Sequence, residues 1–179
     1  GRLLAWGRYQ RGIQVWDVKE RRLQVLEQAK PMTPRYLAWS PDGTRLASGG
    51  TDGKVCLWNR GNRGDIAADT VPQQLSGHHG SVTSMAWSPD GTRLVSASGG
   101  RSGGELVVWE VQSGACLQAI AEHCDLIAAM TWDQSGDLLV SGGSDGMLRW
   151  WEVHSGKCLR ERQAHEGTIW SLKRSPDGY

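Results

Sequence analysis

The chain has 179 residues, and its 20 lysines and arginines nearly balance its 19 aspartates and glutamates, for a net charge of +1. A charge this small creates no overall field that would attract nucleic acid or an anionic membrane. The longest apolar runs are only a few residues, too short for a transmembrane helix. We therefore expect a water-facing domain whose partners are neither nucleic acids nor membranes.

Two short markers recur in step along the chain. The first is a tryptophan followed by a polar or acidic residue at the end of a β-type segment, with intervals of 42, 51 and 42 residues between Trp16, Trp58, Trp109 and Trp151. The second is Ser-Pro-Asp-Gly at 40–43, 88–91 and 175–178, with a degenerate copy at 133–136. A period of about forty residues is expected when each repeat forms one four-stranded propeller blade.

The clearest repeat predicts four β-strands. Residues 82–88 alternate with a period of two and lead into Ser-Pro-Asp-Gly, whose second-place proline and fourth-place glycine suit a type I turn. Residues 92–98, 105–111 and 115–121 supply the other three runs. Since no segment shows a sustained helical stripe, the chain is predicted to be all-β. Its sheets should stack face to face, with Trp39, Trp87 and Trp132 packed between neighbours.

These repeats resemble the WD-repeat (WD40) β-propeller family over essentially the whole chain. The best copy has the family's Gly-His at 77–78 and its Trp-acidic ending at 109–110. The resemblance implies about four blades' worth of four-stranded antiparallel blades. The predicted boundaries are a partial blade at 1–29, complete blades at 30–77, 78–121 and 122–164, and the first strand of a further blade at 165–179. Four such blades leave an open arc, which either further blades of a longer polypeptide or a second copy of this chain would complete.

The resemblance also gives a structural role to a set of polar residues that could be mistaken for a catalytic triad. His123, Ser141 and Asp145 supply the residue types of a nucleophilic triad. However, Ser141 lies inside a predicted strand and lacks a nucleophile-elbow sequence. In the family, such groups form a hydrogen-bonded chain that ends at the indole N–H of the repeat's tryptophan, here Trp151.

The equivalent networks of two other repeats are expected to be incomplete. The repeat that precedes the one with Trp151 has His78, Ser96 and Trp109, but Ser-Gly at 102–103 replaces the loop aspartate. In the second repeat, Lys30 stands in place of the histidine.

Binding in this family takes place around the mouth of the central channel, and the resemblance assigns candidate residues there. Aligning the repeats on their first-strand tryptophans puts Arg35, Thr83, Ala128 and Trp170 at equivalent positions. Trp170 is the most informative, because an indole at a channel mouth can stack on a peptide side chain or clamp an arginine. Its alternative role is packing between blades. The further candidates around it are Tyr36, Thr51, Arg101 and Ser144.

Two insertions and the cysteines complete the expectations. The glycine-rich loop 99–104 lacks the Lys-Ser/Thr of a phosphate-binding loop, and the polar insertion 59–72 is expected to be mobile. Cys116 and Cys158 occupy the same position in successive repeats and are expected to be small buried hydrophobes. Because there is no Cys-x-x-Cys pair, we expect no bound metal, and no cofactor is expected either. Cysteines that are not expected to form disulfides favour a reducing, cytoplasmic compartment.

The sequence favours a non-catalytic scaffold that binds proteins or peptides, as a sensor or docking module of a larger protein. Its regular repeats are similar to those of bacterial multidomain proteins. Two other classes stay open. An enzyme built on a propeller, such as a hydrolase or lyase, would need acidic residues or histidines at the equivalent rim positions, whereas a purely structural segment would need no ligand.

Overall fold

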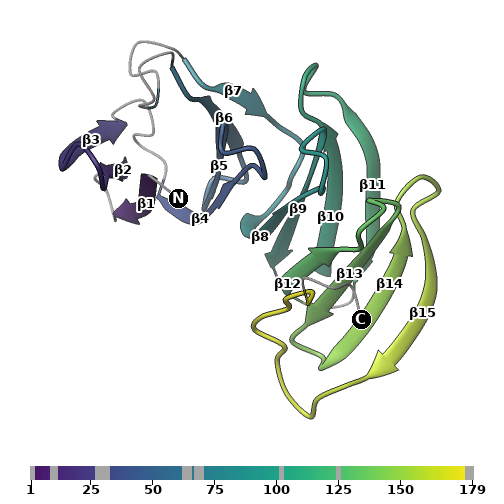
Figure 1. Cartoon of the computed structure of the whole chain (residues 1–179). Helices are drawn as coiled ribbons and strands as arrows, with labels where there is room; N and C mark the ends of the chain where they lie inside the picture. The colour runs from purple at the N-terminus through teal and green to yellow at the C-terminus, as the bar shows by residue number, and fades with distance from the viewer. Residues whose placement is uncertain are drawn as a thin grey trace.

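The computed structural model describes residues 3–8, 12–26, 33–61, 66, 71–100, 103–123 and 126–175. They form antiparallel strands and no helix, so none of the described residues belongs to an apolar helix that could cross a bilayer. Four sheets follow one another along the chain, and we name them blades 1 to 4. Figure 1 shows them side by side in an open arc that confirms the all-β propeller prediction.

The strands of each blade pair in sequence order. Blade 1 contains β1 (Leu3–Arg8), β2 (Gly12–Asp17) and β3 (Arg22–Leu26). Blade 2 contains β4 (Pro34–Trp39), β5 (Arg45–Gly50), β6 (Val55–Asn59) and β7 (Gln73–Leu75). Blade 3 contains β8 (Ser81–Trp87), β9 (Arg93–Gly100), β10 (Gly103–Glu110) and β11 (Cys116–His123). Blade 4 contains β12 (Ile127–Trp132), β13 (Leu138–Gly143), β14 (Met147–Glu152) and β15 (Lys157–Gln163).

Three apolar layers hold the blades together, one between each pair of neighbours. Trp58 belongs to the layer between blades 1 and 2, Trp109 to the next and Trp151 to the last. All three indoles are buried, and aromatic side chains of this size contribute much of the area that such a layer removes from water. Each of these three tryptophans therefore faces the preceding blade.

The first-strand tryptophans add hydrogen bonds to this packing. Trp87 and Trp132 belong to the layers on either side of blade 3, as predicted, and Trp39 packs against the layer between blades 1 and 2. The Nε1 of Trp87 donates to the carbonyl of Ala38 at 3.0 Å, and that of Trp132 to the carbonyl of Ala86 at 3.0 Å. The innermost strands of neighbouring blades are thus fixed relative to one another.

The predicted first strand at 165–179 is not found within its described part. Residues 164–175 carry no strand, because no described strand pairs with them. The segment nevertheless turns back toward β12 (Figure 1), and Ile169 packs on Gly142, where a Cβ would lie 2.7 Å from its Cγ2. Val82 packs on Gly49 of blade 2 in the same way. The segment therefore occupies the position of a first strand without forming its ladder.

Two smaller expectations are also corrected. Cys116 is exposed and Cys158 half-buried rather than fully buried, because β11 and β15 are the outermost strands of their sheets. Within the insertion 59–72, Ile66 is buried against blade 1, and its backbone N–H donates to Gln24 at 3.1 Å. The expected mobility is therefore corrected at Ile66, which is packed and hydrogen-bonded.

Candidate functional site

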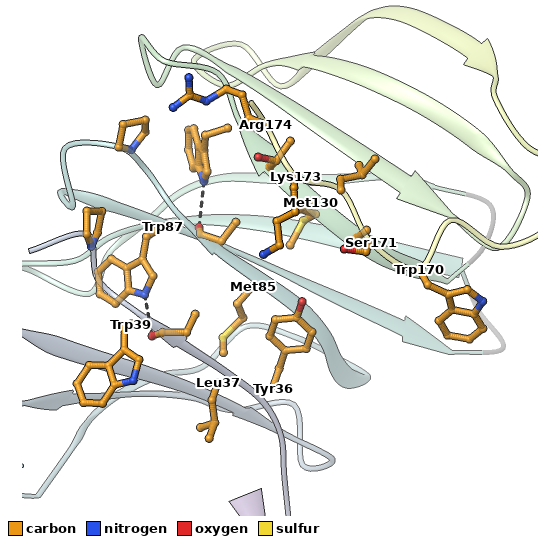
Figure 2. A pocket seen from close by; sticks show the side chains of 18 of the residues that line it. Tyr36, Leu37, Trp39, Met85, Trp87, Met130, Trp170, Ser171, Lys173 and Arg174 are labelled. Atoms are coloured by element: carbon orange, nitrogen blue, oxygen red, sulfur yellow. Dashed lines mark hydrogen bonds between the residues drawn. The ribbon is translucent and has the colours of Figure 1, made fainter. Parts of the chain in front are cut away.

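A cavity of about 760 Å³ lies where the innermost strands of blades 2, 3 and 4 face one another. Strands β4, β8 and β12 line three of its sides, and residues 170–174 line the fourth. Figure 2 shows Leu37, Met85 and Met130 around it, which give the cavity an apolar middle. Its position corresponds to the central channel that the repeats predict.

Three of the predicted channel-mouth residues line this cavity: Arg35, Tyr36 and Trp170. The side chain of Trp170 is 74% exposed, so none of the four described blades covers it. Arg35 is exposed as well, and Tyr36 is half-buried against the core of blades 2 and 3. The three side chains thus provide an aromatic and cationic surface that a ligand could contact.

The other predicted residues do not line the cavity. Thr83 donates its hydroxyl to the carbonyl of Ile127 at 2.7 Å, so it ties blade 3 to blade 4. Ala128 is buried. Thr51 and Ser144 lie in the turns between second and third strands, where their backbone N–H groups bond to Thr33 and Leu126 at the starts of the adjoining first strands. Arg101 lies outside the described residues.

Sequence reasoning missed two cations in the cavity wall, Lys173 and Arg174. They align with the Ala-Trp pairs at 38–39 and 86–87 and with the Thr-Trp pair at 131–132. A basic pair therefore replaces a neutral one in the last repeat. The alignment that selected Trp170 contains this signal, three and four residues further along the chain.

A chain of four polar groups crosses blade 3. Trp109 Nε1 donates to Ser96 Oγ at 2.7 Å, and Ser96 Oγ lies 2.6 Å from His78 Nε2. His78 Nδ1 in turn lies 3.2 Å from Glu105 Oε2. Glu105 on β10 therefore supplies the carboxylate that Ser-Gly at 102–103 does not.

The electrostatics of this network favour an uncharged imidazole. Burial lowers the pKa of His78 below its usual 6.5, although the nearby carboxylate of Glu105 opposes the shift. In the neutral ring, Nδ1–H can donate to Glu105 while Nε2 accepts from the hydroxyl of Ser96, so each polar atom has a partner.

Blade 4 holds the second network, of which the side chain of His123 lies outside the described part. Trp151 Nε1 donates to Ser141 Oγ at 2.8 Å. Asp145 Oδ2 accepts from Arg149 at 2.7 Å, and Arg149 also donates to Glu161 at 2.9 Å. In blade 2, Trp58 Nε1 makes the matching bond to Ser48 at 2.8 Å.

Neither serine is placed for nucleophilic attack. Ser96 and Ser141 are fully buried, and each oxygen accepts an indole N–H. A catalytic serine needs an accessible oxygen and an oxyanion hole at the reacting carbonyl. Ser96, His78 and Glu105 therefore have the composition of a triad but serve to satisfy buried polar groups.

The stacked sheets, the channel cavity and the indole-serine bonds define an open β-propeller arc. The chain belongs to the WD-repeat family, because the model of the WD domain, G-beta repeat, matches residues 29–59, 70–110 and 114–152.

Several curated proteins are similar to this chain. Cell division cycle 20.6, cofactor of APC complex, from Arabidopsis thaliana is 29% identical over 144 residues, which cover 79% of this chain and 33% of that protein. The chromatin assembly factor 1 subunit FAS2 homolog from Oryza sativa subsp. japonica is 30% identical over 153 residues, covering 80% and 30%. Protein hir1 from Schizosaccharomyces pombe is 27% identical over 164 residues, covering 77% and 17%. The chain spans about a third or less of the length of these relatives.

Proposed function

We propose that this chain is a non-catalytic interaction scaffold that holds a peptide or protein loop at the mouth of its channel. The observation that carries the proposal is Trp170, whose largely exposed indole borders the cavity together with Arg35 and Tyr36. Aromatic and arginine side chains dominate the energetics of protein interfaces.

The relatives support the same class of function. Two of them carry names that describe a cofactor of a complex and a subunit of an assembly factor. This chain would then be the docking or sensor module of a larger protein, with further blades or a second copy completing the ring, and a reducing cytoplasmic compartment fits its free cysteines. The three relatives compared above are from two plants and S. pombe, so they lend no support to a bacterial multidomain context.

An enzyme on the same scaffold is the alternative that the cavity favours least. The cavity lining contains no aspartate, glutamate, histidine or cysteine among the described residues. Histidine and carboxylate side chains are the commonest general acids and bases, and Tyr36 and Lys173 are the lining residues that could act in their place.

The test is selection of binding peptides from a random twelve-residue phage library on the immobilised chain, followed by affinity measurements with fluorescein-labelled copies of the selected peptides. Trp170→Ala should weaken binding about tenfold or more, because truncating an aromatic anchor costs more than about 1 kcal/mol. Leu159→Ala, at an exposed position on β15, is the control and should bind normally. Failure to select any peptide, or equal affinity of wild type and Trp170→Ala, would refute the proposal.

A further inference from the structure

The wall of the channel cavity has one sign of charge. Arg35, Lys173 and Arg174 line it, and no acidic residue does so among the described residues. The whole chain is nearly neutral, with a net charge of +1. Three cations around one cavity are therefore a local concentration of positive charge, and a cavity wall of low dielectric strengthens its field.

These three cations are not used by the fold. Elsewhere, the guanidinium of Arg93 lies 5.4 Å from the ring centroid of Trp132, and Arg45 donates to the carbonyl of Val111 at 3.2 Å. Both contacts hold neighbouring blades together. In contrast, the side chains of Arg35, Lys173 and Arg174 are exposed and form no ion pair or hydrogen bond with any described residue. Their charges are available to a ligand.

Apolar and aromatic groups line the cavity together with the cations. Figure 2 places Arg174 and Trp170 at opposite ends, with Lys173 and Met130 between them. Tyr36 and Met85 lie on the facing side. A small inorganic anion would use the charges but leave the exposed indole of Trp170 in contact with water. A peptide with carboxylates flanking apolar side chains would cover both kinds of surface.

We propose that the channel cavity selects acidic peptides, with carboxylates paired to Arg35, Lys173 and Arg174 and an apolar side chain packed against the exposed indole of Trp170. This inference rests on the proposed function, since it names the ligand class of the same site. Carboxylates suit these partners because charge-assisted hydrogen bonds from arginine and lysine to a carboxylate are shorter and stronger than neutral ones.

The probes are three fluorescein-labelled nonapeptides, each with a Leu-Tyr-Leu core flanked on both sides by three glutamates, three glutamines or three lysines. Their affinities for the chain are measured by fluorescence anisotropy. The glutamate peptide should bind at least about tenfold more tightly than either of the others. Lys173→Ala and Arg174→Ala should each weaken its binding by about threefold to tenfold, as expected for partly exposed charge pairs.

A matched control and a competitor make the test specific. Arg22→Ala removes an exposed cation from β3, outside the cavity, and should leave the affinity unchanged. A twelve-nucleotide oligothymidine should compete poorly, because it lacks the apolar side chains that the cavity would cover.

Four results would overturn the inference. The first two are equal binding of the glutamate and glutamine peptides and no detectable binding of any of the three peptides. The third is a glutamate preference that persists in the triple variant with Arg35→Ala, Lys173→Ala and Arg174→Ala. The fourth is competition by oligothymidine as strong as that by unlabelled glutamate peptide. The proposed function is judged separately, because neutral peptides selected from the phage library and lost in Trp170→Ala would uphold it even then.

Discussion

Ser96 and Ser48 occupy equivalent positions but satisfy different numbers of buried partners. Ser96 bonds to both Trp109 and His78, whereas Ser48 bonds to Trp58 alone among the described residues. Replacing Ser96 by alanine would leave an indole N–H and an imidazole nitrogen unpaired in the core, and each unpaired group costs about 1–3 kcal/mol. The two serines therefore provide an internal comparison.

We expect Ser96→Ala to lower the free energy of unfolding by about 2–4 kcal/mol and Ser48→Ala by about 1–2 kcal/mol, measured by urea denaturation at pH 7. Both variants remove the same atom from the same place in a blade, so each controls for the other. Equal losses would show that His78 gains nothing from the serine hydroxyl.

Glu105 shows where prediction at the residue scale stops. His78, Ser96 and Trp109 could be selected from the sequence because they keep the spacing of the repeat. Glu105 could not, because it lies on β10 rather than in the preceding loop, and only the pairing of Glu105 with Ser98 brings its carboxylate near the ring of His78. A missing residue in a motif can thus be replaced from a neighbouring strand.

At the scale of elements, the Ser-Pro-Asp-Gly turns at 40–43 and 88–91 are held by the same hydrogen bonds. Asp42 accepts from the hydroxyls of Ser40 and Thr44 at 2.6 and 2.7 Å, and Asp90 accepts from those of Ser88 and Thr92 at 2.5 and 2.7 Å. The serine hydroxyl is the largest cause that lowers the pKa of each aspartate from 3.8 to about 2.

These turns should make the fold sensitive to acid. Because the folded-state pKa values lie below the unfolded value, the turns stabilise the fold above pH 4, and this stabilisation is lost as the pH falls from 4 to 2. Both carboxylates are exposed, so solvent limits each contribution to about 1 kcal/mol or less. Asp90→Asn should lower the free energy of unfolding at pH 7 by this contribution. Between pH 4 and 2, the stability of the variant should fall less steeply than that of the wild type.

The measurement is thermal unfolding by circular dichroism across this pH range. Asp137→Asn is the control, because no described residue donates a hydrogen bond to the exposed carboxylate of Asp137. An identical pH profile for Asp90→Asn and the wild type would contradict this account of the turn.

The degenerate copy at 133–136 and the insertion 59–72 show how far the sequence predicts elements. The turn forms as expected, but there the carboxylate of Asp133 takes the role of the serine hydroxyl and accepts from the N–H of Leu138 at 3.0 Å. For the insertion, polar composition suggested mobility. The burial of Ile66 depends on blade 1, a surface that local sequence does not reveal.

At the scale of the molecule, periodic patterns in the sequence predict the strand positions and the stacking of the blades. The residues that line the channel are predicted instead by aligning equivalent positions of successive repeats. Alternation over 82–88 predicts β8 closely, and the recurring tryptophans predict the layers that contain Trp58, Trp109 and Trp151. The contacts that join blades could not be predicted in this way. The stacking of Arg93 on Trp132 requires the exact angle between two sheets, which no single repeat encodes.

The outer face of blade 1 is exposed because no described blade covers it. The equivalent tryptophans of blades 2 to 4 are at most 2% exposed because a preceding blade covers them, but Trp16 is only half-buried. It lies in register between Leu4 and Leu23, both of which are exposed, and Trp6 lies beside them. This apolar sheet face has the composition of a surface that packs against another sheet.

We therefore expect the isolated 179-residue chain to self-associate through the outer face of blade 1. Light scattering should give a mass above 19.6 kDa, and a cooperative species of twice that mass would support a ring closed by two copies. Trp6→Glu combined with Leu23→Glu should shift the mass toward 19.6 kDa, because the charges would have to be buried in the contact. Leu117→Glu combined with Leu159→Glu, at exposed positions on the outermost strands β11 and β15, is the matched control and should leave the mass unchanged. A wild-type chain that is monomeric and unfolds cooperatively would mean that the three inter-blade layers suffice without a cover on blade 1.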